Sequence, residues 1–395
     1  MLEGYLRRDG RKGIRNHLAV VYLVECAHHV AREIAYPFRC EGVHLIGFPG
    51  CFPNDYAQHM LERLCTHPNV GAVLLVSLGC ESFNRFRLEK AVAQTGRPVA
   101  TLVIQREGGS RKTMEQGQAW IRQTLPLLQQ AQKVPMEVSE LVIGTVCGGS
   151  DGTSGITGNP AVGRAFDRLV AEGATCIFEE TGELIGCEAV MSARAKTPEL
   201  GRELTAAVEK AAAYYATLGF GSFAAGNSEG GLSTIEEKSM GAYAKSGSSQ
   251  ISGLIKPGEI PPRGGLYLMD VVPDGEVRFG FPNISDNAEI VEMMASGAHM
   301  TLFVTARGSV VGSALGPVLK VCANPETYAR MAGDMDVNAG RVLSGASLAE
   351  VGDEIFDLTL KVAGGRLTAS EALGHAEFIL TYKSFEPAGP ACLPA

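Results

Sequence analysis

The chain has 395 residues, of which 45% are hydrophobic, and a formal net charge of −8 at pH 7. That length suffices for two or three domains with proper cores. Lysine and arginine are scattered, and no run approaches the roughly 18 apolar residues that cross a bilayer, so we expect neither nucleic acid nor membrane as a partner. The first nine residues contain no signal-peptide core, which predicts a cytoplasmic protein whose ten cysteines are reduced.

Four short apolar runs each end on a cysteine. They are 18–25 before Cys26, 43–50 before Cys51, 72–79 before Cys80 and 141–146 before Cys147. Such runs, alternating with helical stretches, are typical of buried parallel strands. Ligands bind at the carboxyl edge of a parallel sheet, so the pattern predicts that these thiols line one functional edge.

Cysteine sulfur binds metals such as iron and zinc, which makes Cys26, Cys51, Cys80 and Cys147 candidate metal ligands. The alternative is packing, because a free cysteine is a small apolar residue, and for any single one packing is favoured. Coincidence at four strand ends is harder to accept. A catalytic thiol or an iron–sulfur cluster fits the same residues. The remaining cysteines are expected to be structural: Cys40, Cys65, Cys176, Cys187, Cys322 and Cys392.

The other elements continue the α/β alternation. In chain order, the patterns predict helices at 27–36 and 55–66, a strand at 98–104, helices at 111–132 and 161–172, a strand at 174–178 and an Ala-rich helix at 198–218. After a segment rich in Gly, Ser and Pro, they predict a strand at 265–272, a helix at 287–296, a strand at 300–305 and helices at 324–333 and 347–363.

This order of elements predicts two Rossmann-like, doubly wound parallel-sheet units. We place the first α/β domain at 1–195 and the second at 265–395. A helical and Gly-rich segment at 196–264 connects them and carries functional loops.

A glycine-rich loop at 147–160 follows a strand and opens a helix, with Asn159 expected as its N-cap and Pro160 at the first helical position. Amides at a helix N-terminus can hold a carboxylate, so Ser150 in this loop is a candidate substrate contact. The loop lacks the Gly-Lys-Ser/Thr ending of a P-loop and the GxGxxG spacing, which argues against a nucleotide.

Shorter glycine turns recur at 108–113, 226–231 and 305–309, and the first and last place a cation beside glycine. Arginine beside a glycine turn can clamp a small anionic acid, which makes Arg111 and Arg307 candidate substrate contacts. The alternative for each is a solvated surface cation, which is favoured for Lys112. Asn227 in the middle turn is a further candidate contact.

Several long motifs occur in one order along the chain. They are Gly-Tyr-Leu-Arg-Arg-Asp-Gly-Arg-Lys-Gly-Ile-Arg-Asn at 4–16, and the segments 77–81, 147–160, 180–188, 230–238 and 334–340. Together they resemble the altronate and galactarate dehydratases and the large subunit of sulfolactate sulfo-lyase, over nearly the whole chain. Arg15 and Asn16 of the first motif are candidate substrate contacts, and Lys238 of the fifth is a candidate catalytic residue.

The resemblance implies a lyase that removes water, or sulfite in the sulfo-lyase branch, from a small hydroxy or sugar acid such as altronate. It also implies a divalent metal, Fe2+ first and Mn2+ second. The family's dehydratases carry a small amino-terminal domain, and the motifs here start at residue 4. The resemblance therefore implies a small partner subunit that carries that domain, and we expect a homo-oligomer of the large subunit.

Two departures bear on the substrate. This chain has Ser222-Phe223 where the sugar-acid dehydratases place Asn-Pro, and Phe48-Pro49 where they carry Thr-His. Loss of polar contacts favours a shorter or less hydroxylated acid, because an unpaired buried hydroxyl costs roughly 1 to 3 kcal/mol.

Elimination needs a base for the α-proton, stabilisation of the enediolate and help for the leaving group. Candidate bases are the carboxylates near strand ends: Glu81, Asp151, Glu180, Glu183 and Glu188. His17, His28 and His29 lack HExxH spacing and are less informative. The non-enzymatic alternative is an inactive sugar-acid-binding scaffold that keeps the fold.

Overall fold

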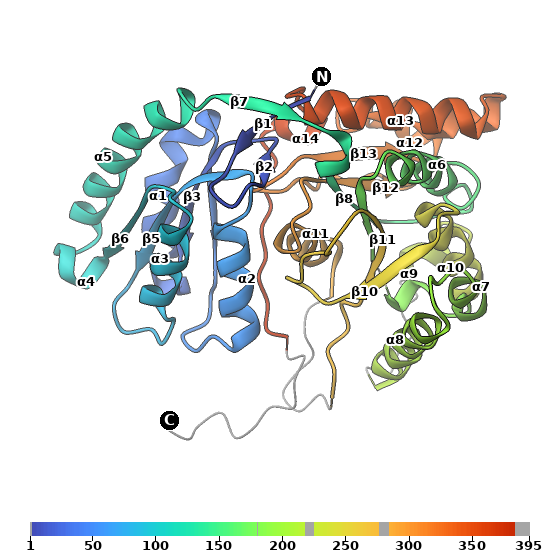
Figure 1. The fold of residues 1–395 in the computed structure, drawn as a ribbon, viewed down its shortest axis with the longest axis horizontal. Coiled ribbons are helices and arrows are strands. Elements are labelled where there is room, and N and C mark those ends of the chain that lie inside the picture. The colour runs from blue at the N-terminus through green and yellow to red at the C-terminus, as the bar shows by residue number, and fades with distance from the viewer. Residues whose placement is uncertain (1, 180, 218–224, 276–283, 384–395) are drawn as a thin grey trace.

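The computed structural model describes residues 2–179, 181–217, 225–275 and 284–383. Two parallel β-sheets lie side by side and helices pack on the faces of each (Figure 1). This architecture confirms the predicted α/β fold. Within the described ranges, no helix is both long and apolar enough to cross a membrane.

The four-stranded parallel sheet has the order β4-β3-β5-β6. Every residue of the central strand β5 is buried, which explains its near-continuous Val and Leu run. The order is that of a flavodoxin-like sheet, so its switch point lies between the first and third strands. The strands are β3 (His17–Tyr22), β4 (Val43–Gly47), β5 (Val70–Ser77) and β6 (Val99–Val103).

Helices cover both faces of this sheet. Two of them, α1 and α5, share one apolar cluster, and a third, α2, packs its buried residues on the opposite face. Asn54 starts α2 because its side chain accepts the Ala57 N–H. The helices are α1 (Glu25–Ala35), α2 (Asp55–Cys65), α3 (Arg85–Gln94), α4 (Ile104–Glu107) and α5 (Ser110–Gln129).

The seven-stranded parallel sheet has the order β10-β11-β9-β8-β12-β13-β14. With β10 set aside, this is the Rossmann order, and the strand order reverses between β8 and β12. The strands are β8 (Val142–Cys147), β9 (Thr175–Phe178), β10 (Ile251–Ile255), β11 (Gly265–Met269), β12 (Met300–Thr305), β13 (Val318–Cys322) and β14 (Val337–Asn338).

One large cluster joins this sheet to α6, α8 and α13, while α11 lies on the other face. A capping box between Ser347 and Glu350 starts α13. The helices are α6 (Gly158–Ala171), α7 (Glu188–Ala193), α8 (Pro198–Thr217), α9 (Ala225–Glu229), α10 (Ile235–Tyr243), α11 (Asp286–Ala295), α12 (Pro325–Arg330), α13 (Leu348–Ala363) and α14 (Ala369–Leu373).

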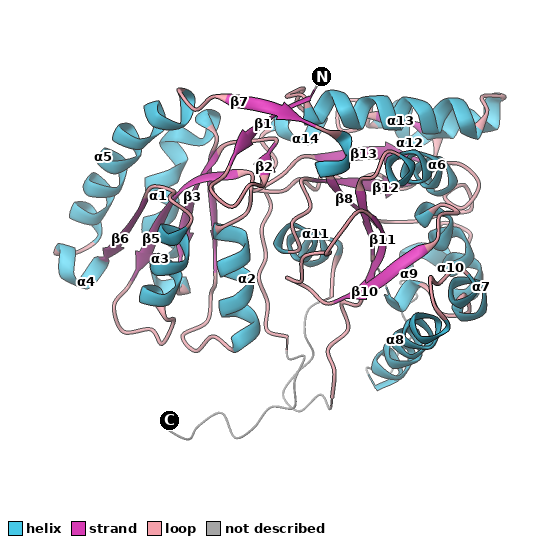
Figure 2. Ribbon diagram, in the orientation of Figure 1, coloured by secondary structure: helices cyan, strands magenta, loops and turns pink. Residues whose placement is uncertain are grey.

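A small antiparallel sheet spans the two units, as Figure 2 shows. It pairs β1 (Leu2–Leu6) with β2 (Lys12–Gly13) on one side and with β7 (Lys133–Met136) on the other. A Cβ at Gly13 would overlap the Pro68 carbonyl, so the close approach of β2 requires glycine there. These strands were missed in the sequence because they are too short to show periodicity.

The two parallel sheets share a continuous core. Phe48 of the first unit and Phe303 of the second belong to one buried cluster, in which α2 and α11 lie between the sheets. Figure 1 shows the segment 376–383 running between these two helices. The units are therefore packed face to face through apolar side chains, not tethered by a flexible linker.

Several expectations need correction. β8 and β9, grouped by sequence with the first unit, pair with the strands of the second, so sheet membership changes between β6 and β8 and not near residue 195. Cys26 lies inside α1, because β3 ends at Tyr22. Thr157, not Asn159, is the N-cap residue of α6, although it forms no side-chain cap. Glu180, Ser222, Phe223 and Cys392 lie outside the described residues.

Asn69 joins the two units through backbone groups. Its Oδ1 accepts the N–H groups of Ile14 (2.9 Å) and Arg15 (3.3 Å), and its Nδ2 donates to the carbonyls of His299 (3.0 Å) and Leu315 (3.1 Å). Asn69 is fully buried, so water cannot replace these bonds.

Asn69→Ala should lower the free energy of unfolding by about 3 kcal/mol, because it leaves buried backbone groups without partners. Urea unfolding measures this loss. Asn84→Ala is the control: it removes the N-cap of α3 at an exposed position and should cost about 1 kcal/mol. Equal losses in the two variants would contradict the bridging role of Asn69.

His299 also connects the units and is held neutral. Its Nε2–H donates to the Lys12 carbonyl (2.8 Å), and its Nδ1 accepts the Val142 N–H (2.9 Å). Burial lowers the pKa of His299 to about 4, from an ordinary value of 6.5.

Because the folded-state pKa is below the unfolded value, the stability from neutral His299 is complete above pH 6.5 and is lost as pH falls through about 4. The loss should amount to about 3 kcal/mol at acid pH. Titration of the histidine ring resonances by NMR checks this. A His299 midpoint near 6.5 would show that the prediction is wrong.

Candidate active site at the carboxyl edge of the seven-stranded sheet

The site begins where β8 and β12 end side by side. Cys147 is the last residue of β8, and the next residue, Gly148, donates its N–H to the Val304 carbonyl (2.8 Å). The carbonyl of Gly149 accepts the Ala306 N–H (3.0 Å). These bonds hold the glycine-rich loop across the switch point, where α/β sheets bind their ligands.

A cavity of about 260 Å3 opens against this loop. Its wall combines loop residues with side chains of α10. The polar lining residues are Ser150, Asp151, Ser154, Asn159, Glu237 and Lys238. Asn159 is almost fully buried, and no donor among the described residues reaches its Oδ1. The wall thus offers an unused hydrogen-bond acceptor and a lysine to a small ligand.

Asp151, a predicted base, is a structural residue of the loop. Its Oδ1 accepts from the Thr153 N–H (2.7 Å) and hydroxyl (2.5 Å), and its Oδ2 accepts from Asn324 Nδ2 (2.8 Å). Both oxygens are therefore occupied. The carboxylate fixes the loop to the segment after β13 and is poorly placed to take a proton.

Lys238, Glu183 and Cys147 form a linked group. Lys238 on α10 is 5% exposed and pairs with Glu183, which lies just after β9. The Cys147 thiol donates to the other oxygen of Glu183 at 3.2 Å. Glu183 is thus fixed from two sides behind Lys238, and Lys238 reaches the cavity wall.

Burial lowers the pKa of Lys238, although nearby Cys147, Asp286 and Glu289 act in the opposite direction. Burial likewise raises the pKa of Asp286 at the start of α11. A lysine with a lowered pKa at a cavity wall, near a carboxyl with a raised pKa, is typical of an active site.

Arg307 and Asn227 lie close to this site through α9. Arg307 Nη1 donates to the Gly226 carbonyl and Nη2 to Glu229 (3.0 Å). Asn227 is buried within the same short helix. Gly152 donates its N–H to the Gly230 carbonyl (3.2 Å), which joins α9 to the glycine-rich loop. Arg307 and Asn227 therefore lie on segments that adjoin the glycine-rich loop, but neither side chain lines the cavity, so their contact with substrate stays a prediction.

The other predicted cysteines lie at the carboxyl edge of the four-stranded sheet. Cys26, Cys51 and Cys80 are all exposed there. Their loops are joined by backbone bonds, from the Glu25 N–H to Pro49 (3.0 Å) and from the Ser82 N–H to Cys51 (2.9 Å). The predicted thiol-lined edge thus exists for three of the four residues, whereas Cys147 belongs to the other sheet.

Glu81 forms local hydrogen bonds at the carboxyl edge of the four-stranded sheet. It accepts hydrogen bonds from the Ser77 hydroxyl and from the Gly79 N–H (2.8 Å). Burial alone would raise the pKa of Glu81, but these two donors lower it overall. An ionised carboxylate with its oxygens occupied is a weak base, so the structure gives no support to a catalytic Glu81.

The four thiols do not form one ligand set, since they are divided between two sheets. Within the described ranges, no three His, Cys, Asp or Glu side chains come together in a way that could hold a metal ion. The described donors therefore do not fit a metal centre of the predicted composition.

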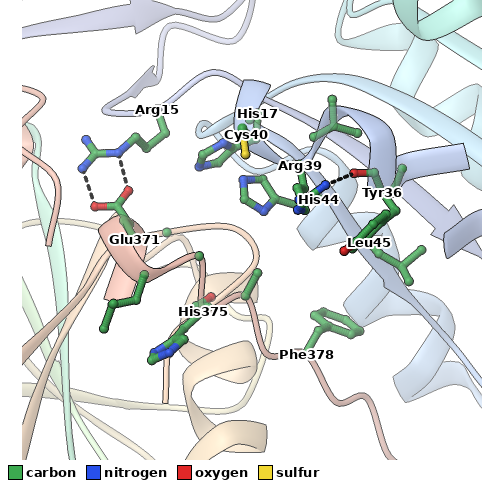
Figure 3. A pocket seen from close by; sticks show the side chains of 18 of the residues that line it. Arg15, His17, Tyr36, Arg39, Cys40, His44, Leu45, Glu371, His375 and Phe378 are labelled. Atoms are coloured by element: carbon green, nitrogen blue, oxygen red, sulfur yellow. Dashed lines mark hydrogen bonds and ion pairs between the residues drawn. The ribbon is translucent and has the colours of Figure 1, made fainter. Parts of the chain in front are cut away.

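Arg15 lies far from both carboxyl edges, before β3, in a separate cavity of about 750 Å3 (Figure 3). Its guanidinium pairs with Glu371 (2.7 Å) and donates to the carbonyls of Ile14, Val362 and Arg366. Every nitrogen is thus used within the protein. The structure gives no support to Arg15 as a substrate contact at a carboxyl edge, because its guanidinium holds α14 against the first unit.

Three further expectations have structural outcomes. Asn16 accepts from Arg7 (2.9 Å) and donates to the Leu128 carbonyl (2.9 Å), so its amide is occupied within the first unit. Arg111 is exposed at the start of α5. Phe48 is buried in the core against Phe83 and Tyr382, so it does not line either cavity.

Sequence reasoning missed Glu179, Asp286 and Glu289, which lie around the lysine. Glu179 follows the buried strand β9 directly, so the strand-end signal that selected Cys147 applies to it as well. Asp286 and Glu289 come from α11, and their approach to β9 is a tertiary contact with no local sequence signal.

Two family models match the sequence of this chain. Residues 138–385 match the family model "D-galactarate/Altronate dehydratase, C-terminal". Residues 4–129 match "D-galactarate dehydratase/Altronate hydrolase, second domain". The chain belongs to the D-galactarate/altronate dehydratase family. The two models meet between α5 and β8, where the chain passes from the four-stranded to the seven-stranded sheet.

The chain is similar to curated lyases of two kinds, a sulfo-lyase subunit and sugar-acid dehydratases. The (2R)-sulfolactate sulfo-lyase subunit beta of Chromohalobacter salexigens is 34% identical, over 96% of this chain and 96% of the relative. The altronate dehydratase of Escherichia coli is 28% identical, over 93% and 74%. The galactarate dehydratase (L-threo-forming) of Escherichia coli is 31% identical, over 92% and 73%.

Glu183→Gln should lower the free energy of unfolding by about 3 kcal/mol at pH 6, because it leaves the buried Lys238 ammonium without its carboxylate. The loss should shrink toward pH 9. A lysine whose folded pKa is lowered costs stability while it is charged, and this cost falls as pH rises through that pKa.

Urea unfolding at the two pH values measures the loss. Glu199→Gln is the matched control, since it breaks an ion pair with Arg202 that is exposed on α8 and should change little. A loss in Glu183→Gln that is the same at both pH values would rule out Lys238 as its cause.

Proposed function

We propose that the chain is the large subunit of a lyase that eliminates a β-leaving group from a small hydroxy or sugar acid, with altronate as the example. The observation that carries the proposal is the buried Lys238–Glu183–Cys147 group at the wall of the switch-point cavity. Family membership supports the reaction class. An inactive acid-binding scaffold is the alternative, and it predicts binding without turnover.

Lys238 is the proposed base, because it lines the cavity and Glu183 does not. In its amine form, Nζ takes the proton from the carbon next to the substrate carboxylate, and the electron pair forms the enediolate. Glu183 orients Nζ and stabilises the ammonium that results. The lowered pKa of Lys238 favours the amine form that this step needs.

The cavity wall supplies the contacts for the acid. The Ser150 hydroxyl and the glycine-rich loop lie where α6 begins, and the positive end of that helix favours a carboxylate. Asn159 Oδ1 has no donor among the described residues, and a substrate hydroxyl would provide one.

The enediolate then expels the β-leaving group. Departing hydroxide takes a proton and leaves as water, after which the enol becomes a 2-keto acid. Sulfite leaves as an anion without needing a proton. The sulfo-lyase reaction is a second candidate, because the chain matches the sulfo-lyase subunit over nearly its full length and the dehydratases over about three quarters.

A divalent metal, Fe2+ or Mn2+, stays a prediction from the family resemblance, and an iron–sulfur cluster stays open. The described residues do not assemble such a site, so we derive no step through it. A small partner subunit, a homo-oligomer of this chain and a cytoplasmic location are likewise proposals. The word "subunit" in the name of the sulfo-lyase relative supports a partner.

The test measures release of keto acid and of sulfite from altronate, galactarate and sulfolactate, with and without a small partner subunit and added Fe2+. We expect one acid to be turned over. Lys238→Met should lower kcat by at least about a hundredfold, because it removes the base. Lys361→Met, at an exposed position on α13, should leave kcat unchanged.

The alternatives give different results in the same assay. Sulfite from sulfolactate would identify the sulfo-lyase branch. Binding of an acid without turnover in every combination would favour the scaffold. Full activity of Lys238→Met would show that Lys238 is not the base.

A further inference from the structure

Behind the lysine lies a group of buried carboxyls that the proposed elimination does not use. Glu179 follows β9, and Glu289 and Glu292 lie on α11; all three are at most 5% exposed. Neither Glu179 nor Glu289 lines the cavity. Three acids in the interior are costly unless each is paired with a cation or kept neutral.

Glu292 has its cation. Lys383 Nζ lies 2.6 Å from Glu292 Oε1, and the Tyr56 hydroxyl donates to the same carboxylate. Lys383 is itself fully buried and also donates to the Val271 carbonyl (3.1 Å). Glu292 is thus neutralised by a lysine, just as Glu183 is paired with Lys238.

Glu179 has no such partner. In the described part of the chain, no donor reaches either of its carboxyl oxygens except the carboxyl of Glu289, against which it lies. An ionised carboxylate only accepts hydrogen bonds, so two ionised groups cannot bond to each other. The contact is favourable only when one of the two carries a proton.

We propose that Glu179 and Glu289 form a carboxyl pair that holds one proton at neutral pH. By limiting the negative charge near Lys238, this shared proton lets the Lys238 ammonium lose a proton and act as a base. The inference rests on the proposed role of Lys238 as base. Glu179 and Glu289 are positioning residues in this scheme, since they act through Lys238 and do not touch the cavity.

The electrostatic link between the pair and the lysine is direct. Negative charge on Glu289 and on Glu179 raises the pKa of Lys238. A doubly ionised pair would hold Lys238 as an ammonium, which cannot accept the α-proton. One shared proton removes half of that charge, so the burial of Lys238 can lower its pKa.

The surroundings favour the protonated form. Burial raises the pKa of Glu179 well above its ordinary value, and burial raises the pKa of Glu289 to about 7. Two cations oppose this effect, because Lys245 lowers the pKa of Glu179 and Lys383 lowers that of Glu289. Besides Glu292 and Lys383, the titratable groups that face the pair are Cys147 on β8, Tyr215 on α8, Lys238 on α10, Lys245 in the turn after α10, and Asp286 on α11.

Glu179→Gln tests the charge of the pair, because the amide has the charge of the proposed neutral acid and keeps a donor for Glu289. The acid limb of the kcat/KM pH profile, which reports loss of the Lys238 proton, should stay where it is in the wild type. The double variant Glu179→Gln, Glu289→Gln removes the remaining charge, so its limb should move about one pH unit lower. A limb that moves equally far in Glu179→Gln alone would show that the wild-type pair is doubly ionised.

Infrared spectroscopy at pH 7 tests the proton without any substrate. The wild type should show a protonated carboxyl band that weakens in Glu179→Gln and in Glu289→Gln but not in Glu203→Gln, an exposed position on α8. If no acid is turned over, the proposed function fails while this measurement still decides the protonation state. An unchanged band in both variants would overturn the pair, and so would loss of bound iron in them, which would make these residues ligands.

Discussion

The site depends on the stabilisation of one buried cation. Lys238 lies on a short helix with little apolar surface of its own, and it enters the protein because Glu183 meets it there. Cys147 donates to the same carboxylate, so the last residue of a core strand fixes the counter-ion. Removing an ammonium from water costs several kcal/mol, and only a held carboxylate offsets this. The ion pair with Glu183 therefore allows Lys238 to be buried beside the glycine-rich loop.

The local structure at the two sheet edges explains why we place the proposed site at the seven-stranded sheet. Both sheets have a switch point, and polar groups gather at both. At the four-stranded sheet, the carboxylate of Glu81 is consumed by local hydrogen bonds, and the thiols face solvent. At the seven-stranded sheet, the loop after β8 is bonded to β12, which leaves a cavity with a buried lysine beside it. A surface that faces solvent is available to a partner, whereas a cavity lined by polar groups suits a small acid.

The sequence predicted what depends on local pattern. Buried runs such as β5 and β8 were recognisable because both faces of a parallel strand are apolar, and the helix α13 begins at its capping box. The positions of Arg15 and Cys26 differ from the expected ones for a geometric reason. A motif gives residue types but not the end of the strand at which they lie: Arg15 precedes β3, and Cys26 falls one residue inside α1.

The rest depends on tertiary contacts that no local pattern encodes. Glu179 ends a buried strand, and its partner Glu289 is on a helix that the chain reaches only after β10 and β11. In the sequence each is one acid among 43 acidic residues, with nothing to mark it. Only the packing of α11 against the sheet brings them together, in a region where charge cannot be screened by water. Burial raises the pKa of both acids, although Lys245 acts against this at Glu179 and Lys383 at Glu289. In the proposed scheme the pair therefore holds one proton, and that proton determines whether the neighbouring lysine can act as a base.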